Sequence, residues 1–218
     1  NPIGIDIENP RFSWEVQSNE RGTGQSAYQI QVSGRREALN NAGQKEWDPG
    51  KISESQSVNI EYNGTPLESG KTYYWRVRVW DQSGNASKWS NIGYFHVGPM
   101  NESDWEGSWI GAADTTLTAP LLRRDFQLSK PVKEAYAYIV GLGYYELYLN
   151  GSKVGDHVLD PATTNYNKRA LYEAYDVTDH LTGEDNAIGV WLGKGYFKHR
   201  TTKRYGDRPQ LLFQLLVR

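Results

Sequence analysis

The 218-residue sequence predicts an all-β protein made of two successive β-sandwiches. Short segments alternate apolar and polar side chains with a period of two, the pattern of strands that bury one face. Turn-forming residues recur about every ten residues, and no segment sustains helical periodicity. The chain contains 8 tryptophans and 15 tyrosines, which suit sandwich cores made of large alternating side chains.

Residues 1–99 are expected to form the first domain. The strongest strand signal covers residues 71–80, where Tyr73 and Trp75 lie on the same face. Asp81-Gln-Ser-Gly84 provides the turn that follows. The other strands of this half are predicted over residues 11–16, 27–33, 57–62 and 89–97.

A combination of marker residues characterises this half: Leu67, Tyr73, the run Trp75-Arg-Val-Arg-Val79, Gly84 and Trp89-Ser90. Together they resemble a fibronectin type III domain, an immunoglobulin-like sandwich. The resemblance implies that Tyr73 pins its strand by hydrogen-bonding to upstream backbone. Arg76 and Arg78 are expected to stack over Trp80 or Trp89, with a ligand-binding aromatic patch as the alternative. We interpret this domain as a spacer or packing module.

Residues 100–218 are expected to form the second domain. Gly98-Pro99 ends the first sandwich, and residues 101–104 make a polar connector without periodicity. Trp105 and Trp109 follow, and their position beside the connector indicates packing between the two domains.

The clearest element of the second domain is a tyrosine-rich hairpin. Tyr145, Leu147 and Leu149 share one face, and Asn150-Gly151 is the pair that most readily forms a type I′ turn. Further strands are predicted over residues 121–128, 133–140, 172–176, 187–192 and 211–217. The last strand ends without a turn, so we expect a jelly-roll-like sandwich that is incomplete at its C-terminus.

A series of motifs runs through this half: Asp104-Trp105, Trp109-Ile-Gly111, Ala119-Pro-Leu-Leu-Arg123, Gly141–Gly155, Asp160-Pro161, Tyr166-Asn-Lys-Arg169, Tyr175-Asp-Val-Thr-Asp179 and Asn186–Gly195. With the fibronectin-like half before it, this order resembles the N-terminal region of bacterial α-L-rhamnosidases over essentially the whole chain. The resemblance implies a parent enzyme that removes terminal L-rhamnose with inversion, using carboxylates on a helical barrel further along. Inverting hydrolysis needs an acid and a base about 6.5–9.5 Å apart.

The chain carries no such helical barrel, so no catalytic residue is assigned and the chain alone is expected to be inactive. Glu146 and Asp156 form the one tempting local pair, and we interpret both as solvated charges on an exposed hairpin. The implied partner is the catalytic barrel of the parent protein. The alternative is the accessory jelly roll of another glycosidase, with a purely structural role in interdomain packing.

In some relatives the corresponding jelly roll holds rhamnose beside a calcium ion, which makes the loop over residues 156–167 the candidate carbohydrate site. Calcium, a hard cation that takes about 6–8 oxygen ligands, is the candidate ion at Asp156 and Asp160. Glycans that contain L-rhamnose are the candidate partner. The residues assigned to sugar binding are Asp156, Asp160, Asn165, Tyr166 and Asn167.

This loop departs from the family pattern. Ala162-Thr-Thr-Asn-Tyr166 stands where relatives usually have Gly-Trp-Thr-Asp-Tyr, and Gly195-Tyr-Phe197 stands where they usually have Gly-Trp-Tyr. The loop therefore lacks a stacking ring and one carboxylate, which predicts weak binding. Packing of the loop against the catalytic barrel is the alternative.

Composition argues against several other functions. A net charge of −2 speaks against nucleic-acid binding, and the basic segment 194–204 is expected to be a solvated, flexible loop. The absence of cysteine excludes disulfides and thiolate metal sites. No apolar run has the length of a membrane span. The resemblance implies a bacterial source and leaves the compartment open, with export to the periplasm or the cell exterior as one alternative.

Overall fold

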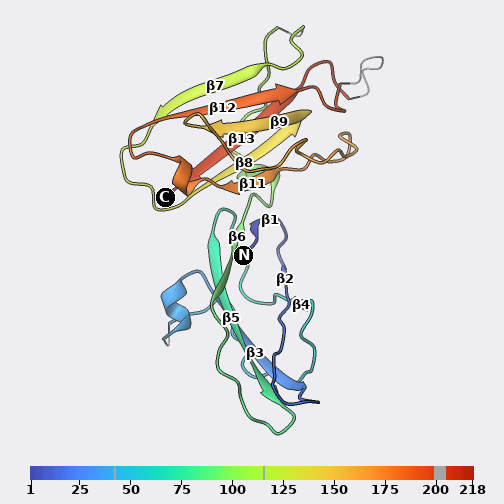
Figure 1. Cartoon of the computed structure of the whole chain (residues 1–218), viewed down its shortest axis with the longest axis vertical. Helices are drawn as coiled ribbons and strands as arrows, with labels where there is room; N and C mark the ends of the chain where they lie inside the picture. The colour runs from blue at the N-terminus through green and yellow to red at the C-terminus, as the bar shows by residue number, and fades with distance from the viewer. Residues whose placement is uncertain (42, 115, 199–204) are drawn as a thin grey trace. The chain divides into compact units, whose positions relative to one another are not determined.

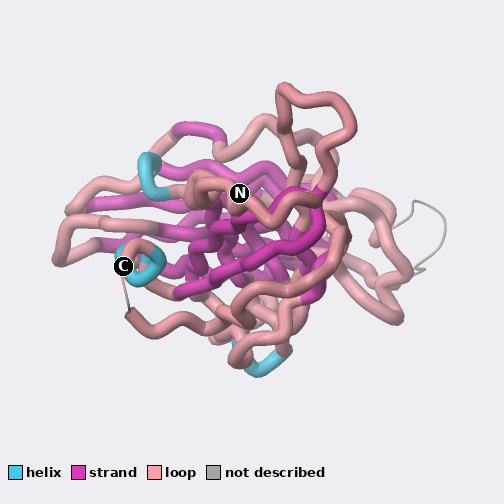
Figure 2. Tube along the Cα trace, turned by 90° about the horizontal axis from the view of Figure 1, so that it is seen from below, coloured by secondary structure: helices cyan, strands magenta, loops and turns pink. Residues whose placement is uncertain are grey.

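The computed structural model describes residues 1–218 except 42, 115 and 199–204. The chain divides into two compact units, Asn1–Asp104 and Trp105–Arg218, which are described separately. Both units consist of strands and loops, and helix is limited to short 3₁₀ turns in the described residues (Figures 1 and 2). The predicted all-β class is confirmed. None of the helical turns in this part of the chain is long and apolar enough to cross a membrane.

The first unit contains a four-stranded sheet in the order β1-β6-β5-β3 and a two-stranded sheet of β2 and β4 (Figure 1). β3 and β5 pair antiparallel over most of their length, and β1 pairs parallel with β6 at the edge. The elements are β1 (Ile3–Ile5), β2 (Arg11–Phe12), β3 (Gln25–Ser33), the 3₁₀ turn η1 (Arg36–Leu39), β4 (Ile60–Glu61), β5 (Thr72–Asp81), β6 (Gly93–Val97) and the 3₁₀ turn η2 (Glu102–Asp104).

Phe12 lies at the centre of an aromatic core between the two sheets of the first unit. Its ring centroid lies 5.0 Å from that of Trp75, 5.8 Å from that of Phe95 and 6.0 Å from that of Trp47. Only 4% of the Phe12 surface is exposed. Aromatic pairs at tilted or edge-on geometry stabilise a core beyond the area they bury. The frequent aromatic residues of this half therefore serve mainly as core.

β2 and β4 are shorter than the sequence predicts. Regular pairing is confined to Arg11↔Glu61 and Phe12↔Ile60. Beyond it, Asn59 adopts a φ of 57°, which does not fit an extended strand. The predicted strands over 11–16 and 57–62 are thus only partly confirmed, because a left-handed residue interrupts the ladder.

Tyr73 forms the predicted corner. Its buried hydroxyl accepts a hydrogen bond from the Glu68 N–H at 3.0 Å, and its ring stacks on Phe95. Burial raises the pKa of Tyr73, so the hydroxyl stays protonated near neutral pH. The expectation that this tyrosine pins β5 to upstream backbone is confirmed.

The second unit is a sandwich of two antiparallel sheets, in the orders β10-β9-β12-β7 and β11-β8-β13 (Figure 1). The inner faces enclose an apolar core that includes Ile139, Leu147, Leu149 and Leu192, each almost fully buried. The elements are β7 (Leu121–Gln127), β8 (Ala135–Leu142), β9 (Tyr144–Leu149), β10 (Ser152–Lys153), β11 (Glu173–Asp176), the 3₁₀ turn η3 (Thr178–His180), β12 (Asp185–Gly193) and β13 (Gln210–Val217).

The predicted hairpin connects β9 to β10. Asn150 and Gly151 have φ values of 50° and 82°, the two positive angles that a type I′ turn requires. Asn150 also has a tertiary role, because its side-chain amide donates to the His180 carbonyl oxygen and its side-chain oxygen accepts from the Ala187 N–H. The turn residue therefore ties the hairpin to β12.

Candidate functional site

The loop assigned to sugar binding runs between β10 and β11 and is anchored in two places. Val154 is buried, and its N–H donates to the Leu147 carbonyl oxygen at 2.8 Å. The Tyr145 N–H donates to the Asp160 carbonyl oxygen at 3.0 Å, which joins the middle of the loop to β9. Leu159, between these anchors, has a φ of 64°, a left-handed conformation that is strained for a branched residue.

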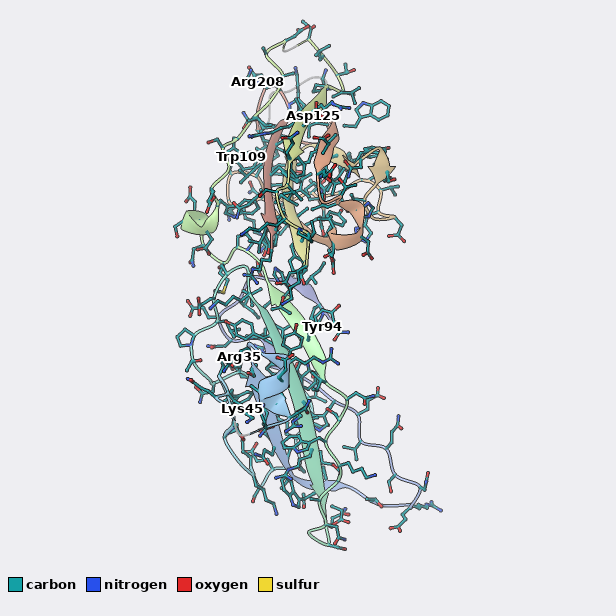
Figure 3. All side chains as sticks on the ribbon, turned by 90° about the vertical axis from the view of Figure 1, so that its left-hand side faces the viewer. Arg35, Lys45, Tyr94, Trp109, Asp125 and Arg208 are labelled. Atoms are coloured by element: carbon teal, nitrogen blue, oxygen red, sulfur yellow. The ribbon has the colours of Figure 1, made fainter. Side chains whose placement is uncertain are left out.

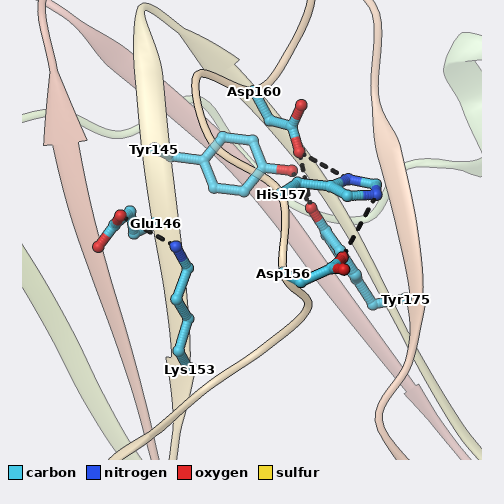
Figure 4. Close-up of polar contacts among 7 residues, drawn as sticks. All are labelled: Tyr145, Glu146, Lys153, Asp156, His157, Asp160 and Tyr175. Atoms are coloured by element: carbon cyan, nitrogen blue, oxygen red, sulfur yellow. Dashed lines mark hydrogen bonds and ion pairs between the residues drawn. The ribbon is translucent and has the colours of Figure 1, made fainter.

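A hydrogen-bonded cluster surrounds the Asp160 carboxylate (Figure 4). One carboxylate oxygen lies 2.9 Å from Nδ1 of His157 and accepts from the Tyr175 hydroxyl at 3.2 Å. The Tyr175 hydroxyl in turn lies 3.0 Å from the Tyr145 hydroxyl. This cluster links the loop to β9 and β11, the strands on opposite sheets from which the two tyrosines come.

Both tyrosines of the cluster remain protonated at neutral pH. Burial raises the pKa of Tyr145, and burial also raises the pKa of Tyr175 to about 12. The Tyr175 hydroxyl can therefore donate to the Asp160 carboxylate while it accepts from Tyr145. Burial and the nearby Asp160 carboxylate raise the pKa of Glu173 as well. The arrangement orients Asp160 and holds the loop in place.

Asp156 lies beside this cluster but contributes little to it. Its side chain is 101% exposed, and its carboxylate is 3.9 Å from Nε2 of His157. The carboxylate therefore has free hydrogen-bonding capacity toward solvent or a ligand.

Asn165, Tyr166 and Asn167 form a separate turn. The Asn165 carbonyl oxygen accepts from the N–H groups of Lys168 and Arg169, and its side-chain oxygen accepts from the Asn167 N–H. In the described part of the chain, no hydrogen bond joins this turn to the Asp160 cluster. The structure thus brings Asp156 and Asp160 together and places the other three candidate residues in a second group.

The Tyr166 ring is partly buried in an aromatic cluster. It packs edge-on against Phe197 and Tyr205, with ring centroids 5.4 and 5.2 Å away. Its hydroxyl is buried, and Thr163 is the polar side chain beside it. Burial raises the pKa of this hydroxyl. Tyr166 therefore presents a ring edge and a buried polar atom rather than a free stacking face.

The residues as placed do not assemble a calcium shell. The Asp160 oxygen is already engaged by His157 and Tyr175, and an imidazole is a poor ligand for a hard cation. Within the described residues, no group of three or more acidic, histidine or cysteine side chains is placed to hold a metal ion. Calcium at Asp156 and Asp160 therefore stays a prediction.

Glu146 is held on the outer face of β9 and is not simply a solvated charge. Its carboxylate accepts from the Tyr148 hydroxyl at 2.8 Å. It also accepts from Nζ of Lys153 at 3.0 Å, as Figure 4 shows. These hydrogen bonds lower the pKa of Glu146. A general acid needs a raised pKa, so Glu146 does not have the properties of one.

The outer face of the sheet β10-β9-β12-β7 carries a feature that the sequence interpretation missed. Trp191, on the central strand β12, is 49% exposed and lies between Gly189 and Gly193 on the same face. We call this surface the β12 face; it consists of Ala187, Gly189, Trp191 and Gly193 with their cross-strand neighbours Leu121, Arg123, Asp125, Tyr144, Glu146 and Tyr148. The sequence signal was the alternation Gly189-Val-Trp-Leu-Gly193, read only as a strand.

The outer face of the first unit carries the predicted cation–π stack. The Arg76 and Arg78 guanidinium groups lie 4.2 and 4.7 Å from the Trp89 ring, and Arg78 lies 4.9 Å from the Trp80 ring. The stacking prediction is therefore confirmed. The two arginines also donate hydrogen bonds to the buried glutamines Gln29 and Gln31. The guanidinium groups of the stack thus already have hydrogen-bond partners within the first unit. This favours a structural role over the alternative of a ligand-binding patch.

The remaining predictions concern Trp105, Trp109 and the basic segment 194–204. Trp105 packs edge-on against Tyr138 and Tyr172 inside the second unit. Trp109 is 46% exposed on the segment beside β13 (Figure 3). Much of the basic segment 194–204 lies outside the described residues; in its described part, Phe197 is 7% exposed and packed.

Two family models match the chain. Residues 1–101 match the Rha78A-like, N-terminal immunoglobulin domain, and residues 130–218 match the alpha-L-rhamnosidase N-terminal domain.

Among curated proteins, an alpha-L-rhamnosidase of Formosa agariphila is 40% identical over 221 residues, covering 90% of this chain and 23% of its own length. An alpha-L-rhamnosidase of Alteromonas sp. is also 40% identical, covering 100% of this chain and 25% of its own length. The solved alpha-L-rhamnosidase from Dictyoglumus thermophilum superimposes with a TM-score of 0.90 at 42% identity, over 100% of this chain and 26% of that one. The chain thus spans about a quarter of the length of these relatives.

Proposed function

This chain carries the two N-terminal, non-catalytic β domains of the α-L-rhamnosidase family, and on that premise we propose that it is the accessory region of an enzyme that removes terminal L-rhamnose with inversion. The observation that supports this role most directly is the matched order of both domains in relatives about four times as long. Its own carboxylates are committed to hydrogen bonds or exposed singly, as described for Glu146, Asp156 and Asp160.

Exposed apolar side chains indicate what the accessory region does. In the first unit they are the scattered residues Ile7, Val16 and Val58. In the second unit, apart from the β12 face, they include Trp109, Ile110, Leu117, Val158, Leu159, Leu171 and Tyr196. Large apolar groups exposed together mark surfaces that contact other proteins or ligands. We infer that the second unit packs against further domains of the parent enzyme.

The isolated chain is expected to release no product from an aryl α-L-rhamnoside. Inverting hydrolysis needs a protonated acid opposite a base, and the lowered pKa of Glu146 makes this residue unsuitable as the acid. The measurement is the release of the aryl group at high protein concentration, with a full-length α-L-rhamnosidase as the positive control. Turnover that survives repurification and is lost in Glu146→Gln would contradict this expectation.

A second candidate function is weak sugar binding by the loop over residues 156–167. One observation favours it: the carboxylate of Asp156 is fully exposed and free to accept a further hydrogen bond. A sugar hydroxyl can donate to the Asp156 carboxylate, and this charge-assisted bond is stronger than one between neutral groups. Because the loop presents a ring edge in place of a stacking face, the contact is expected to be weak.

L-Rhamnose is expected to bind this loop in the millimolar range, which corresponds to about −4 kcal/mol. Titration of the ¹⁵N-labelled chain, with and without calcium, should shift amide signals within 156–167. Asp156→Ala should weaken binding without lowering the unfolding temperature, because that carboxylate is fully exposed. Tyr166→Phe is the matched control, since this hydroxyl is buried and its removal should leave sugar binding unchanged.

Two outcomes would count against the loop site. Signal shifts confined to Trp80–Trp89 would place the sugar contact in the first unit. Unchanged spectra at high sugar concentration would leave the region with a packing role alone.

A further inference from the structure

The β12 face has an open floor that the fold itself does not require. Gly189 and Gly193 occupy one face of a central strand, where glycine lowers stability relative to residues with a side chain. A Cβ atom added at Gly189 would come no closer than 3.8 Å to Tyr148, and one at Gly193 no closer than 3.6 Å to the Tyr144 carbonyl oxygen. Neither position has a positive φ. Glycine at these two positions therefore leaves room for a ligand to approach the backbone.

The Trp191 side chain projects from β12 between the two glycines. Its cross-strand neighbours are Glu146 on β9 and Leu121 on β7, and half of its surface is exposed. The same-face positions on either side of it along β12 are glycines and carry no side chain that could cover the indole. An exposed ring in such a setting can pack against the apolar C–H face of a sugar.

Glu146 supplies a fixed hydrogen-bond acceptor next to the ring. One of its oxygens accepts from Tyr148 and the other from Lys153. An ionised carboxylate offers about four acceptor sites, so each oxygen retains capacity for a further donor. Because Tyr148 and Lys153 already orient the group, a ligand hydroxyl would meet a preorganised acceptor.

The face continues along β12 into a hollow with several polar side chains in its lining. The hollow measures about 520 Å³ and is lined by Arg123, Asp125, Gln127, Asn150 and Ala187, among others. Asp125 lies on β7 in Figure 3 and pairs with Arg123 at 2.7 Å. From Ala187 to Gly193 the strand is roughly 20 Å long, enough for a ligand with several repeating units.

The charges of the face are balanced. Arg123 lies beside Asp125, and Lys153 lies beside Glu146, so each cation has a carboxylate partner. Such a surface offers no net field for an acidic or a basic ligand. It does offer an aromatic ring and many donors and acceptors, which complement a neutral molecule rich in hydroxyl groups.

We propose that the β12 face binds a neutral oligosaccharide chain, with Trp191 as the stacking platform, Glu146 as the hydroxyl acceptor and Gly189 as the open floor. The proposal rests on the proposed accessory role only for the expectation that a glycan is the ligand. It concerns a different surface from the loop over 156–167. The competing occupant is another protein domain, which the following test separates from a sugar.

The test titrates the ¹⁵N-labelled chain with a neutral hexasaccharide that ends in L-rhamnose and, separately, with an oligogalacturonate of equal length. The neutral chain is expected to shift the signals of β12 and the Trp191 indole, and the acidic chain to bind at least ten-fold more weakly. Trp191→Ala should weaken binding at least ten-fold. Trp109→Ala, which removes a tryptophan of similar exposure away from the face, should leave binding unchanged.

Gly189→Val is the decisive variant. Valine suits a strand and has room here, so the unfolding temperature should stay the same or rise while binding is lost. Binding that persists in both Gly189→Val and Trp191→Ala would overturn the proposal. Binding lost only with Asp156→Ala would move the glycan to the loop and leave the accessory role intact. Absence of any hexasaccharide binding would assign the β12 face to a protein domain.

Discussion

Gly143→Ala is expected to destabilise the second unit by about 3–5 kcal/mol, because it combines backbone strain with a steric clash. Gly143 joins β8 to β9 and has a φ of 127°, a conformation that residues with a side chain avoid. An added Cβ would lie 2.1 Å from the Gly193 carbonyl oxygen and 3.1 Å from that of Lys194. Since both are backbone atoms, β9 and β12 would have to separate. Urea unfolding followed by circular dichroism measures the loss.

Gly151→Ala is the matched control for this prediction. Gly151 also has a positive φ, 82°, but no atom lies within 4 Å of the position of an added Cβ. Its replacement should therefore cost only the left-handed backbone strain, about 1–2 kcal/mol. Equal losses at the two glycines would show that contact with the end of β12 contributes nothing.

Phe12→Ala is expected to destabilise the first unit by about 3–5 kcal/mol, the usual range for removing a buried aromatic ring. The ring contacts Trp47, Trp75 and Phe95, so its loss would leave a cavity between the two sheets. β2 is paired over only two residues, and this side chain is its main attachment to the core. Unfolding in guanidinium, monitored by tryptophan fluorescence, gives the change.

Phe12→Leu serves as the control, because it keeps an apolar group in the same place. It should cost roughly 1–2 kcal/mol, since leucine fills much of the space without new polar atoms. A loss as large as that of the alanine variant would mean that the aromatic contacts themselves, rather than the filled volume, hold β2. A negligible loss in both variants would show that β2 is dispensable for the first unit.

The two carbohydrate hypotheses make different demands on the molecule. The loop offers one exposed carboxylate, Asp156, and a partly buried ring, so a monosaccharide would find few contacts there. The β12 face offers an exposed ring, a fixed acceptor and a long open strand, which suit a chain of sugars. An accessory region that holds the glycan chain on one face would help a catalytic domain reach the terminal residue by raising its effective concentration.

The sequence alone determined the class of fold and most of its strands. Alternation with period two marks a strand whatever its neighbours are, so β5, β8, β9, β12 and β13 lie within a few residues of their predicted ranges. Asn150-Gly151 fixed the hairpin because its φ preferences are local. The role of Tyr73 followed from the resemblance to fibronectin type III domains, and the arginine stack followed from local spacing within one strand.

Tertiary structure decided how these elements serve a site. Alternation separates the two faces of a strand but does not show which side chains of different strands are neighbours. The pairing of Trp191 with Glu146 and Leu121 could therefore not be predicted from the sequence. The candidate residues of the loop over 156–167 lie in two groups because Asp160 forms hydrogen bonds with Tyr145 and Tyr175, which are distant in sequence. Hydrogen bonds between distant residues depend on which strands become neighbours, and sheet order is not encoded in any local pattern.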